Sequence, residues 1–204
     1  MKMNFIEKWM VNRSVTGKSG EKLAKKLLSH AELESSNKFL DIGCGRGVIT
    51  RFIAENYQGE FFGIDTDADE LSIAKSKSDP ENITYMEADA RSLPFEARSF
   101  DVVIAFGVLH HIPDWYKAVE EIGRVLKVGG TFITAELVYP DWVANMDEKS
   151  SFKFGIYSLD TVKLVRLIQD QGFVTIFKEE KERIMWTDFQ AVYKKKFEKA
   201  WSRV

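Results

Sequence analysis

Hydrophobic and polar positions follow two different patterns along the chain. Up to about residue 30, apolar side chains recur at intervals of three and four, which is the period of an amphipathic helix. From residue 37 onward, short apolar runs alternate with amphipathic stretches, as strands alternate with helices. We therefore expect an N-terminal helical cap over residues 1–30, interrupted by a turn at 14–20, where glycine and serine gather.

The apolar runs predict seven strands. Most of them alternate with helical patterns, which is typical of a mostly parallel sheet with helices on both faces. The last two runs have no helix between them, so they should form an antiparallel C-terminal hairpin at one edge. The predicted fold class is α/β and Rossmann-like. The expected strands are 38–42, 61–64, 83–86, 100–106, 131–138, 173–177 and about 183–192.

Several helix boundaries carry their own signals. Asp67, followed three residues later by Glu70, predicts the capped start of one helix. Asp114 is expected to cap the next helix, which Gly129 and Gly130 would stop. The last helix is expected to start at Ser158, to turn Val162, Val165 and Ile168 inward, and to end at Gly172.

The length and composition fit one domain over residues 1–204. The hydrophobic content of 45% is enough for a full core. Within this domain we expect a cofactor-binding core at 37–138 and a candidate substrate lid at 139–157, which contains several aromatic side chains. The last helix and hairpin would occupy 158–193.

Charge and hydropathy limit the classes of partner that the protein is expected to have. The 29 basic and 31 acidic residues nearly cancel, which disfavours nucleic acid as a partner. The longest apolar run, 102–109, is too short to cross a bilayer, and no apolar signal core follows Met1, so a cytoplasmic protein is expected. Peripheral membrane contact through the basic and aromatic tail 193–203 is left open, although a solvated helix is favoured there. The single cysteine rules out an intramolecular disulfide, and no metal is expected.

A glycine-rich loop follows the first predicted strand and precedes a helix. It reads Asp41-Ile42-Gly43-Cys44-Gly45-Arg46-Gly47. Glycines allow a tight turn and let a ligand approach the backbone, while the helix start leaves amide donors free. In open α/β sheets, ligands bind at this carboxyl end of the strands. The loop alone fits either a dinucleotide or another nucleoside-containing ligand.

Two acidic residues make the prediction of the ligand more specific. Asp65 ends the second strand, 24 residues after Asp41, where a carboxylate can accept hydrogen bonds from both hydroxyls of a ribose. Asp89 follows the third strand after another 24 residues and could accept a hydrogen bond from the amine of adenine. Together with the loop, these acids describe an adenosyl ligand. The glycine spacing also differs from the Gly-x-Gly-x-x-Gly of nicotinamide enzymes.

A longer series of motifs occurs in the order of a known family. They are Leu40-Asp41-Ile42-Gly43-Cys44-Gly45-Arg46-Gly47, Gly63-Ile64-Asp65, Ala88-Asp89-Ala90, Leu93-Pro94-Phe95, Phe100-Asp101-Val102-Val103, Leu109-His110-His111-Ile112 and Leu126-Lys127-Val128-Gly129-Gly130. With them, residues 37–138 resemble the class I S-adenosylmethionine-dependent methyltransferases. The chain is most similar to the small-molecule branch that includes the ubiquinone and menaquinone methyltransferases.

The resemblance implies S-adenosylmethionine as cofactor, with S-adenosylhomocysteine as product. Asp41, Gly43 and Gly45 would surround its methionine part. Phe106 and Gly107 would line the methionyl amine and the sulfonium.

The resemblance also implies an adenosine-binding side. Asp65 would bind the ribose hydroxyls, and Thr66 would lie against the adenine. Asp89 would bind the adenine amine, with the amide of Ala90 nearby. Thr66 departs from the bulky apolar residue often found at its position, which weakens its assignment.

Absent motifs favour metal-free in-line transfer to a small molecule, which could be apolar or aromatic. His110 and His111 are candidates for a catalytic base, and the alternative is that one packs beneath the cofactor while the other orders the loop that follows. Glu136 and Tyr139 could also point inward, although Glu136 is more simply interpreted as a rim carboxylate or ion-pair partner. Two other functions stay open: a non-catalytic S-adenosylmethionine-binding regulator or partner subunit, and a tRNA or protein methyltransferase. The oligomeric state is also open.

Overall fold

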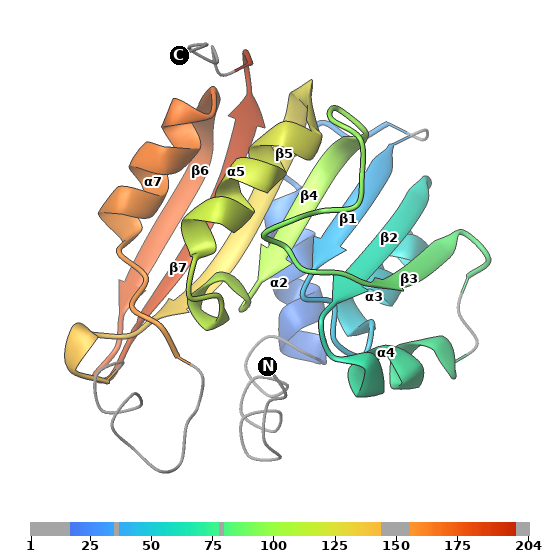
Figure 1. The fold of residues 1–204 in the computed structure, drawn as a ribbon, viewed down its shortest axis with the longest axis horizontal. Coiled ribbons are helices and arrows are strands. Elements are labelled where there is room, and N and C mark those ends of the chain that lie inside the picture. The colour runs from blue at the N-terminus through green and yellow to red at the C-terminus, as the bar shows by residue number, and fades with distance from the viewer. Residues whose placement is uncertain (1–16, 35–36, 78–79, 144–155, 199–204) are drawn as a thin grey trace.

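A computed structural model describes residues 17–34, 37–77, 80–143 and 156–198. It contains one seven-stranded sheet in the order β3-β2-β1-β4-β5-β7-β6 (Figure 1). The sequence therefore predicted the sheet correctly, including the antiparallel strands at one edge. The strands are β1 (Lys38–Ile42), β2 (Glu60–Asp65), β3 (Ile83–Glu87), β4 (Phe100–Phe106), β5 (Leu126–Val138), β6 (Phe173–Glu182) and β7 (Thr187–Lys195).

Helices cover both faces of this sheet. In Figure 1, α5 and α7 lie in front of the strands, whereas α2 and α3 lie behind them. Residues 1–16 of the expected N-terminal cap and 144–155 of the expected lid lie outside the described residues. The helices are α2 (Lys18–Leu28), α3 (Val48–Asn56), α4 (Ala68–Lys75), α5 (Trp115–Val125), α7 (Thr161–Asp170) and the short 3-10 helix η1 (Leu109–His111).

The core follows from the alternation of side chains along strands that are buried on both faces. In β1, Leu40 and Ile42 pack in the cluster that includes α5 and α7. Phe39 points the other way, into the cluster formed with α2 and α3. Strand order reverses between β1 and β4, since β1 pairs in parallel with β2 on one side and with β4 on the other. A ligand site is expected at this reversal.

The last helix differs from its predicted bounds. It begins at Thr161 rather than at Ser158, because the Asp160 carboxylate caps it by accepting from the Val162 and Lys163 amides, both at 3.0 Å. This start places Val162 at 63% exposure, so its predicted inward position was wrong. Leu164 and Ile168 are the buried residues of α7.

Other boundaries shift by shorter distances. Gly20 lies within α2 and is buried, so the predicted turn at 14–20 does not extend to it. The helix α5 ends at Val125, because the chain already pairs at Leu126 with the start of β4. Asp114 is the residue before α5, but its side chain makes no capping bond to the backbone. Asp67 does cap α4, through the amides of Asp69 and Glu70.

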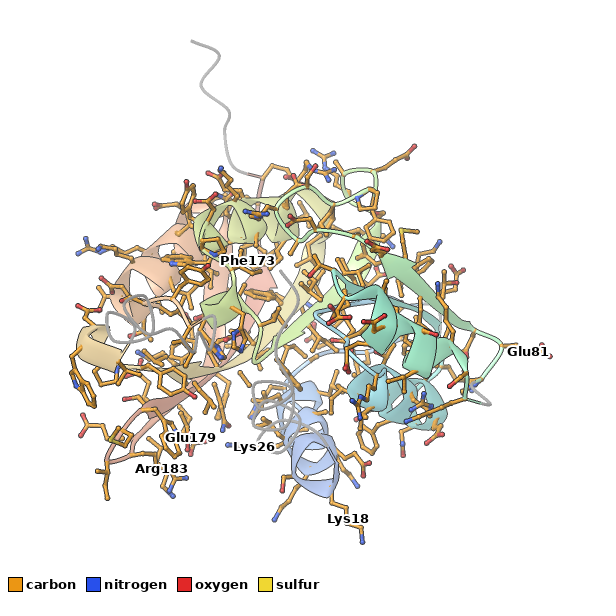
Figure 2. The ribbon with its side chains drawn as sticks, turned by 60° about the horizontal axis from the view of Figure 1, so that its bottom comes forward. Lys18, Lys26, Glu81, Phe173, Glu179 and Arg183 are labelled. Atoms are coloured by element: carbon orange, nitrogen blue, oxygen red, sulfur yellow. The ribbon has the colours of Figure 1, made fainter. Side chains whose placement is uncertain are left out.

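The antiparallel edge is tied to the helix on the rear face. Lys26 of α2 forms an ion pair with Glu179 of β6, and both are labelled in Figure 2. Lys26 also donates to Gln190 of β7 at 3.0 Å. Within the described residues, no helix has the length and apolarity needed to cross a membrane.

Candidate functional site

The carboxyl ends of β1, β2, β3 and β4 come together through direct contacts. The Gly45 amide, after β1, donates to the Asp65 carboxylate at 2.9 Å. The Ala88 amide, after β3, donates to the Asp65 carbonyl at 3.1 Å. A Cβ added to Gly43 would lie 2.5 Å from Val108 Cγ2, so the loop after β4 touches the glycine loop. The loops that follow these four strands therefore lie in contact with one another at one end of the sheet.

The glycine loop needs glycine at its turns. Gly43, Gly45 and Gly47 all have positive φ, at 71°, 50° and 71°. At Gly47 a Cβ would also collide with the hydroxyl of Tyr85, at 2.2 Å. At Gly45, in contrast, the added Cβ would lie 4.0 Å from its neighbour Glu70 Oε2, which leaves room for a ligand. Cys44 is buried between these turns, and burial raises the pKa of its thiol, which suits a packing role rather than a reactive one.

Asp41 is the buried carboxyl group of this loop. Its Oδ2 accepts a hydrogen bond from Thr50 Oγ1 at 2.6 Å. Burial raises the pKa of Asp41 from 3.8 to about 7, the Thr50 hydroxyl lowers it, and the neighbouring Asp65 charge adds to the rise. A cationic group placed beside Asp41 would favour its ionised form.

The Asp65 carboxylate is hydrogen-bonded to two loops, one after β1 and one after β2. One carboxylate oxygen accepts from the Gly45 amide and the other from the Asp67 amide, each at 2.9 Å. Burial raises the pKa of Asp65, and these amides oppose that rise. The Thr66 amide also lowers the pKa of Asp65, and the four lone pairs of a carboxylate still leave acceptor capacity for a hydroxyl donor. Thr66, next in the chain, is exposed at the same rim.

Asp89 has a protein partner of its own. Its carboxylate is held by the Arg91 guanidinium, with the closest contact at 2.7 Å. This hydrogen bonding to Arg91 lowers the pKa of Asp89. If Asp89 also bound the amine of adenine, its carboxylate would accept hydrogen bonds from both that amine and Arg91. Ala90 is buried beside it, packed in the cluster with α5.

The loop after β4 contains the remaining candidates. Phe106 is buried against the α2 and α3 face, and Gly107 has a φ of 63°. The Gly107 amide donates to the Ala135 carbonyl at 2.7 Å, which ties this loop to β5. His110 and His111 follow on η1, with ring centroids 4.1 Å apart. His110 is buried, whereas His111 is partly exposed.

The arrangement has features that suit S-adenosylmethionine. Gly45 offers open space beside its backbone, Asp65 has free acceptor capacity, and Asp41 is a buried carboxyl group that a cation would ionise. These three features match a ligand with hydroxyl donors and an ammonium group. The residues present therefore fit the cofactor that the motifs imply.

Sequence reasoning missed or undervalued several residues of this site. Tyr85 of β3 packs beneath the glycine loop, and no sequence signal placed it there. Glu70 forms a 2.9 Å ion pair with Arg46 of the loop, although its sequence position suggested only a helix cap. Glu136, for which a rim position, an ion-pair role and an inward position were all open, is a buried partner of His110. These contacts join residues that are far apart in the sequence.

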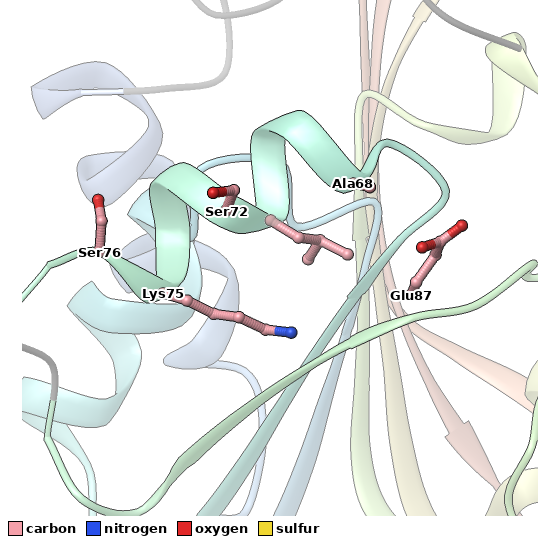
Figure 3. Close-up of a pocket in the computed structure, with 6 residues that line it drawn as sticks. Ala68, Ser72, Lys75, Ser76 and Glu87 are labelled. Atoms are coloured by element: carbon pink, nitrogen blue, oxygen red, sulfur yellow. The ribbon is translucent and has the colours of Figure 1, made fainter.

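A separate shallow pocket lies beside α4 and β3. Figure 3 shows Lys75 and Glu87 from these two elements at its wall. None of the predicted cofactor residues lines it. It adjoins the site at the strand ends, since Glu87 pairs with Asp65 across β2 and β3. The pocket is lined by Ala68, Leu71, Ser72, Lys75, Ser76 and Glu87.

Known proteins share both the sequence motifs and the fold. Residues 40–134 match the methyltransferase domain family. The demethylmenaquinone methyltransferase of Staphylococcus saprophyticus is 36% identical over 120 residues, which are 57% of this chain and 51% of that protein. The enzyme of the same name from Staphylococcus aureus is 38% identical over 120 residues, covering 57% of this chain and 49% of that protein. The chain thus spans about half the length of these curated relatives.

Solved structures share the fold. One is a chain from the complex between the Haloferax volcanii Trm112 methyltransferase activator and a putative methyltransferase, and it superposes on this protein with a TM-score of 0.75. The match has 20% identity and covers 94% of this chain and 93% of that one. At this identity the likeness concerns the fold. The seven-stranded sheet is the Rossmann-like fold of class I methyltransferases. Residues 40–134, just under half of the chain, are similar to methyltransferase domains, for which S-adenosylmethionine is the typical methyl donor.

Proposed function

We propose that the protein transfers a methyl group from S-adenosylmethionine to a small molecule. The observation that carries this proposal is the bonding of Asp65. Its carboxylate accepts from the loop after β1 and its carbonyl accepts from the loop after β3, while the carboxylate keeps acceptor capacity for a ligand. The domain match over residues 40–134 supports the same activity. When bound, the cofactor supplies a methyl group that is already activated.

The chain's own residues would hold the methionine part at the glycine loop. Asp41 would face the ammonium group, while Gly43 and Gly45 let the ligand lie against the backbone. Phe106 and Gly107 would line the reacting end from the loop after β4. These residues orient the donor and exclude water from it.

The adenosine part would lie between the ends of β2 and β3. Asp65 would accept from the ribose hydroxyls, and Thr66 would lie along the adenine. Asp89 would accept from the adenine amine, with the Ala90 amide beside it. His110 and His111, on η1, are the candidate proton acceptors for the methyl acceptor.

For the acceptor, we propose a small aromatic or apolar molecule. The support is the similarity to proteins named demethylmenaquinone methyltransferases, whose sequences match this chain over the domain. The aromatic Tyr139 and Trp142, which follow β5 at the same end of the sheet, are compatible with such an acceptor.

The first test is cofactor binding by the wild type and Asp65→Asn. Calorimetry should detect S-adenosylmethionine and S-adenosylhomocysteine binding to the wild type. The asparagine variant should bind at least about tenfold more weakly, because a lost hydrogen bond to a charged group costs about 1.5–3 kcal/mol. Asp101→Asn is the matched control, since Asp101 also accepts a backbone amide, that of Lys38 at 2.8 Å, but at the opposite end of the sheet.

The second test is transfer of labelled methyl groups. The wild type is incubated with labelled S-adenosylmethionine and either a small-molecule and lipid extract or a soluble demethylmenaquinone analogue. Label in the extract or the analogue supports the proposal. Label only in RNA or protein contradicts the small-molecule acceptor, and cofactor binding without any transfer favours a non-catalytic regulator.

A further inference from the structure

A buried carboxylate and imidazole meet beside the proposed transfer site. His110 Nδ1 lies 2.6 Å from Glu136 Oε2, and the two side chains are 3% and 0% exposed. The other carboxylate oxygen accepts from the Val108 and Leu109 amides at 3.3 and 3.1 Å. Glu136 therefore holds both the loop after β4 and the imidazole that this loop carries.

The register of the sheet explains why these residues meet. Phe106 of β4 pairs with Ala135 of β5, and both face the α2 and α3 side. Because side chains alternate along a strand, Glu136 points to the opposite side, where α5 packs. The 3-10 helix η1 folds back over this side, and its Leu109 is buried in the α5 cluster. Glu136 thus lies directly below the amides of η1.

His110 also connects the loop after β4 to the residues that follow β5 and precede α7. Its carbonyl accepts from the Tyr157 amide at 2.8 Å, just before α7. Its ring centroid lies 5.8 Å from that of Tyr139, which follows β5. The imidazole of His110 thus lies near Tyr139, while its backbone is bonded to Tyr157.

The contacts select one tautomer of the imidazole. A carboxylate has only acceptors, so His110 Nδ1 must carry the proton that is donated to Glu136. In the neutral ring this leaves Nε2 unprotonated. A histidine oriented in this way by a buried carboxylate is able to accept a proton at Nε2.

We propose that Glu136 is a positioning residue that fixes His110 as the proton acceptor for methyl transfer, an inference that rests on the proposed function. The proton leaves an O–H or acidic C–H bond of the methyl acceptor, whose electron pair stays on that oxygen or carbon. It forms a new N–H bond at His110 Nε2, and Glu136 balances the resulting positive charge. The substrates in question are therefore hydroxyl compounds or carbon acids rather than acceptors that react without losing a proton.

Glu136→Gln provides a sharp test, because glutamine keeps the shape but replaces one of the two acceptor oxygens with an NH₂ donor. Its single oxygen is needed by the Val108 and Leu109 amides, so its NH₂ group would face His110 Nδ1. The imidazole would then have to accept there and carry its proton on Nε2. The variant should thus show the opposite tautomer.

Nitrogen-15 NMR of the imidazole rings measures this tautomer directly. The chain has only three histidines, so His110→Gln and His111→Gln spectra assign the signals. The wild type should show a protonated Nδ1 on His110, and Glu136→Gln a protonated Nε2. Asp101→Asn is the control and should leave the His110 signals unchanged. A wild-type His110 that is protonated only on Nε2, or a tautomer that is the same in Glu136→Gln, would overturn the proposal.

The kinetic measurement uses labelled S-adenosylmethionine and the demethylmenaquinone analogue. Glu136→Gln should lower kcat about 10²-fold or more, the usual contribution of a general base, with cofactor affinity unchanged. A fall of less than about threefold with a flipped tautomer would refute the catalytic role. Failure of the wild type to bind S-adenosylmethionine would instead refute the proposed function, and the NMR result on Glu136 and His110 would be unaffected by it.

Discussion

The carboxyl group of Asp41 is enclosed at the end of β1, so its charge is costly until a cation lies beside it. Burial raises its pKa from 3.8 to about 7. We predict that Asp41→Asn stabilises the cofactor-free protein at alkaline pH while weakening cofactor binding. Asparagine keeps the shape and an oxygen acceptor for the Thr50 hydroxyl, which lies 2.6 Å from Oδ2. Only the buried charge is removed.

The magnitude follows from linkage between protonation and folding. Because the folded pKa lies above the unfolded one, the folded state binds more protons and loses stability as pH rises from about 4 to about 7. A shift of about three units corresponds to about 4 kcal/mol over that whole window, of which about 2.5 kcal/mol falls between pH 5 and pH 8. The asparagine side chain does not titrate. The unfolding free energy of Asp41→Asn relative to wild type should therefore rise by about 2.5 kcal/mol between pH 5 and pH 8.

Urea unfolding of both proteins at pH 5, 6, 7 and 8 measures this difference, with Asp101→Asn as a control for loss of a partly exposed carboxylate. Calorimetry at pH 8 should show weaker S-adenosylmethionine binding to Asp41→Asn. If the difference in unfolding free energy is constant across the pH range, the cost does not come from a charge on Asp41. If affinity is unchanged, Asp41 does not face the ammonium group.

Two further predictions concern packing and a buried ammonium group. Gly43→Ala should lower the unfolding free energy by about 2–4 kcal/mol in urea titrations, because it adds a positive-φ penalty and a 2.5 Å contact with Val108. Adding Val108→Ala should recover only part of the loss, since Val108 Cβ would still lie 2.8 Å from the new methyl group, and full recovery would contradict the clash. Lys195→Met should cost about 2–4 kcal/mol, because the buried Nζ donates to the Gly123 and Leu126 carbonyls at 2.8 and 2.9 Å and to Glu198. Thermal unfolding checks this, and an unchanged Tm would show that water satisfies those carbonyls.

Local sequence signals were sufficient for the sheet and for the residues at its carboxyl ends. Apolar runs marked the central strands well, because strands buried on both faces need them. The edge strand β6 is mostly exposed, and its polar second half continues to Glu182, beyond the predicted end at 177. Gly43 and Asp65 were recognisable because a turn with positive φ and a strand-end acid each depend on one residue type. Helix bounds were less accurate. The α7 start depended on Asp160 rather than on the nearby Ser158, and both are residue types that cap helices.

The carboxylate–imidazole pair illustrates a different kind of limit. Glu136 and His110 are 26 residues apart, and no spacing rule connects them. Their contact depends on the pairing of Phe106 with Ala135, on the alternation that follows, and on the fold of η1 over the sheet. A shift of one residue in the β4–β5 register would turn Glu136 toward the α2 and α3 side and leave the Val108 and Leu109 amides without it. Chemistry at the strand ends is thus determined by register as much as by residue type, which is why the structure was needed to identify His110 as the partner of Glu136.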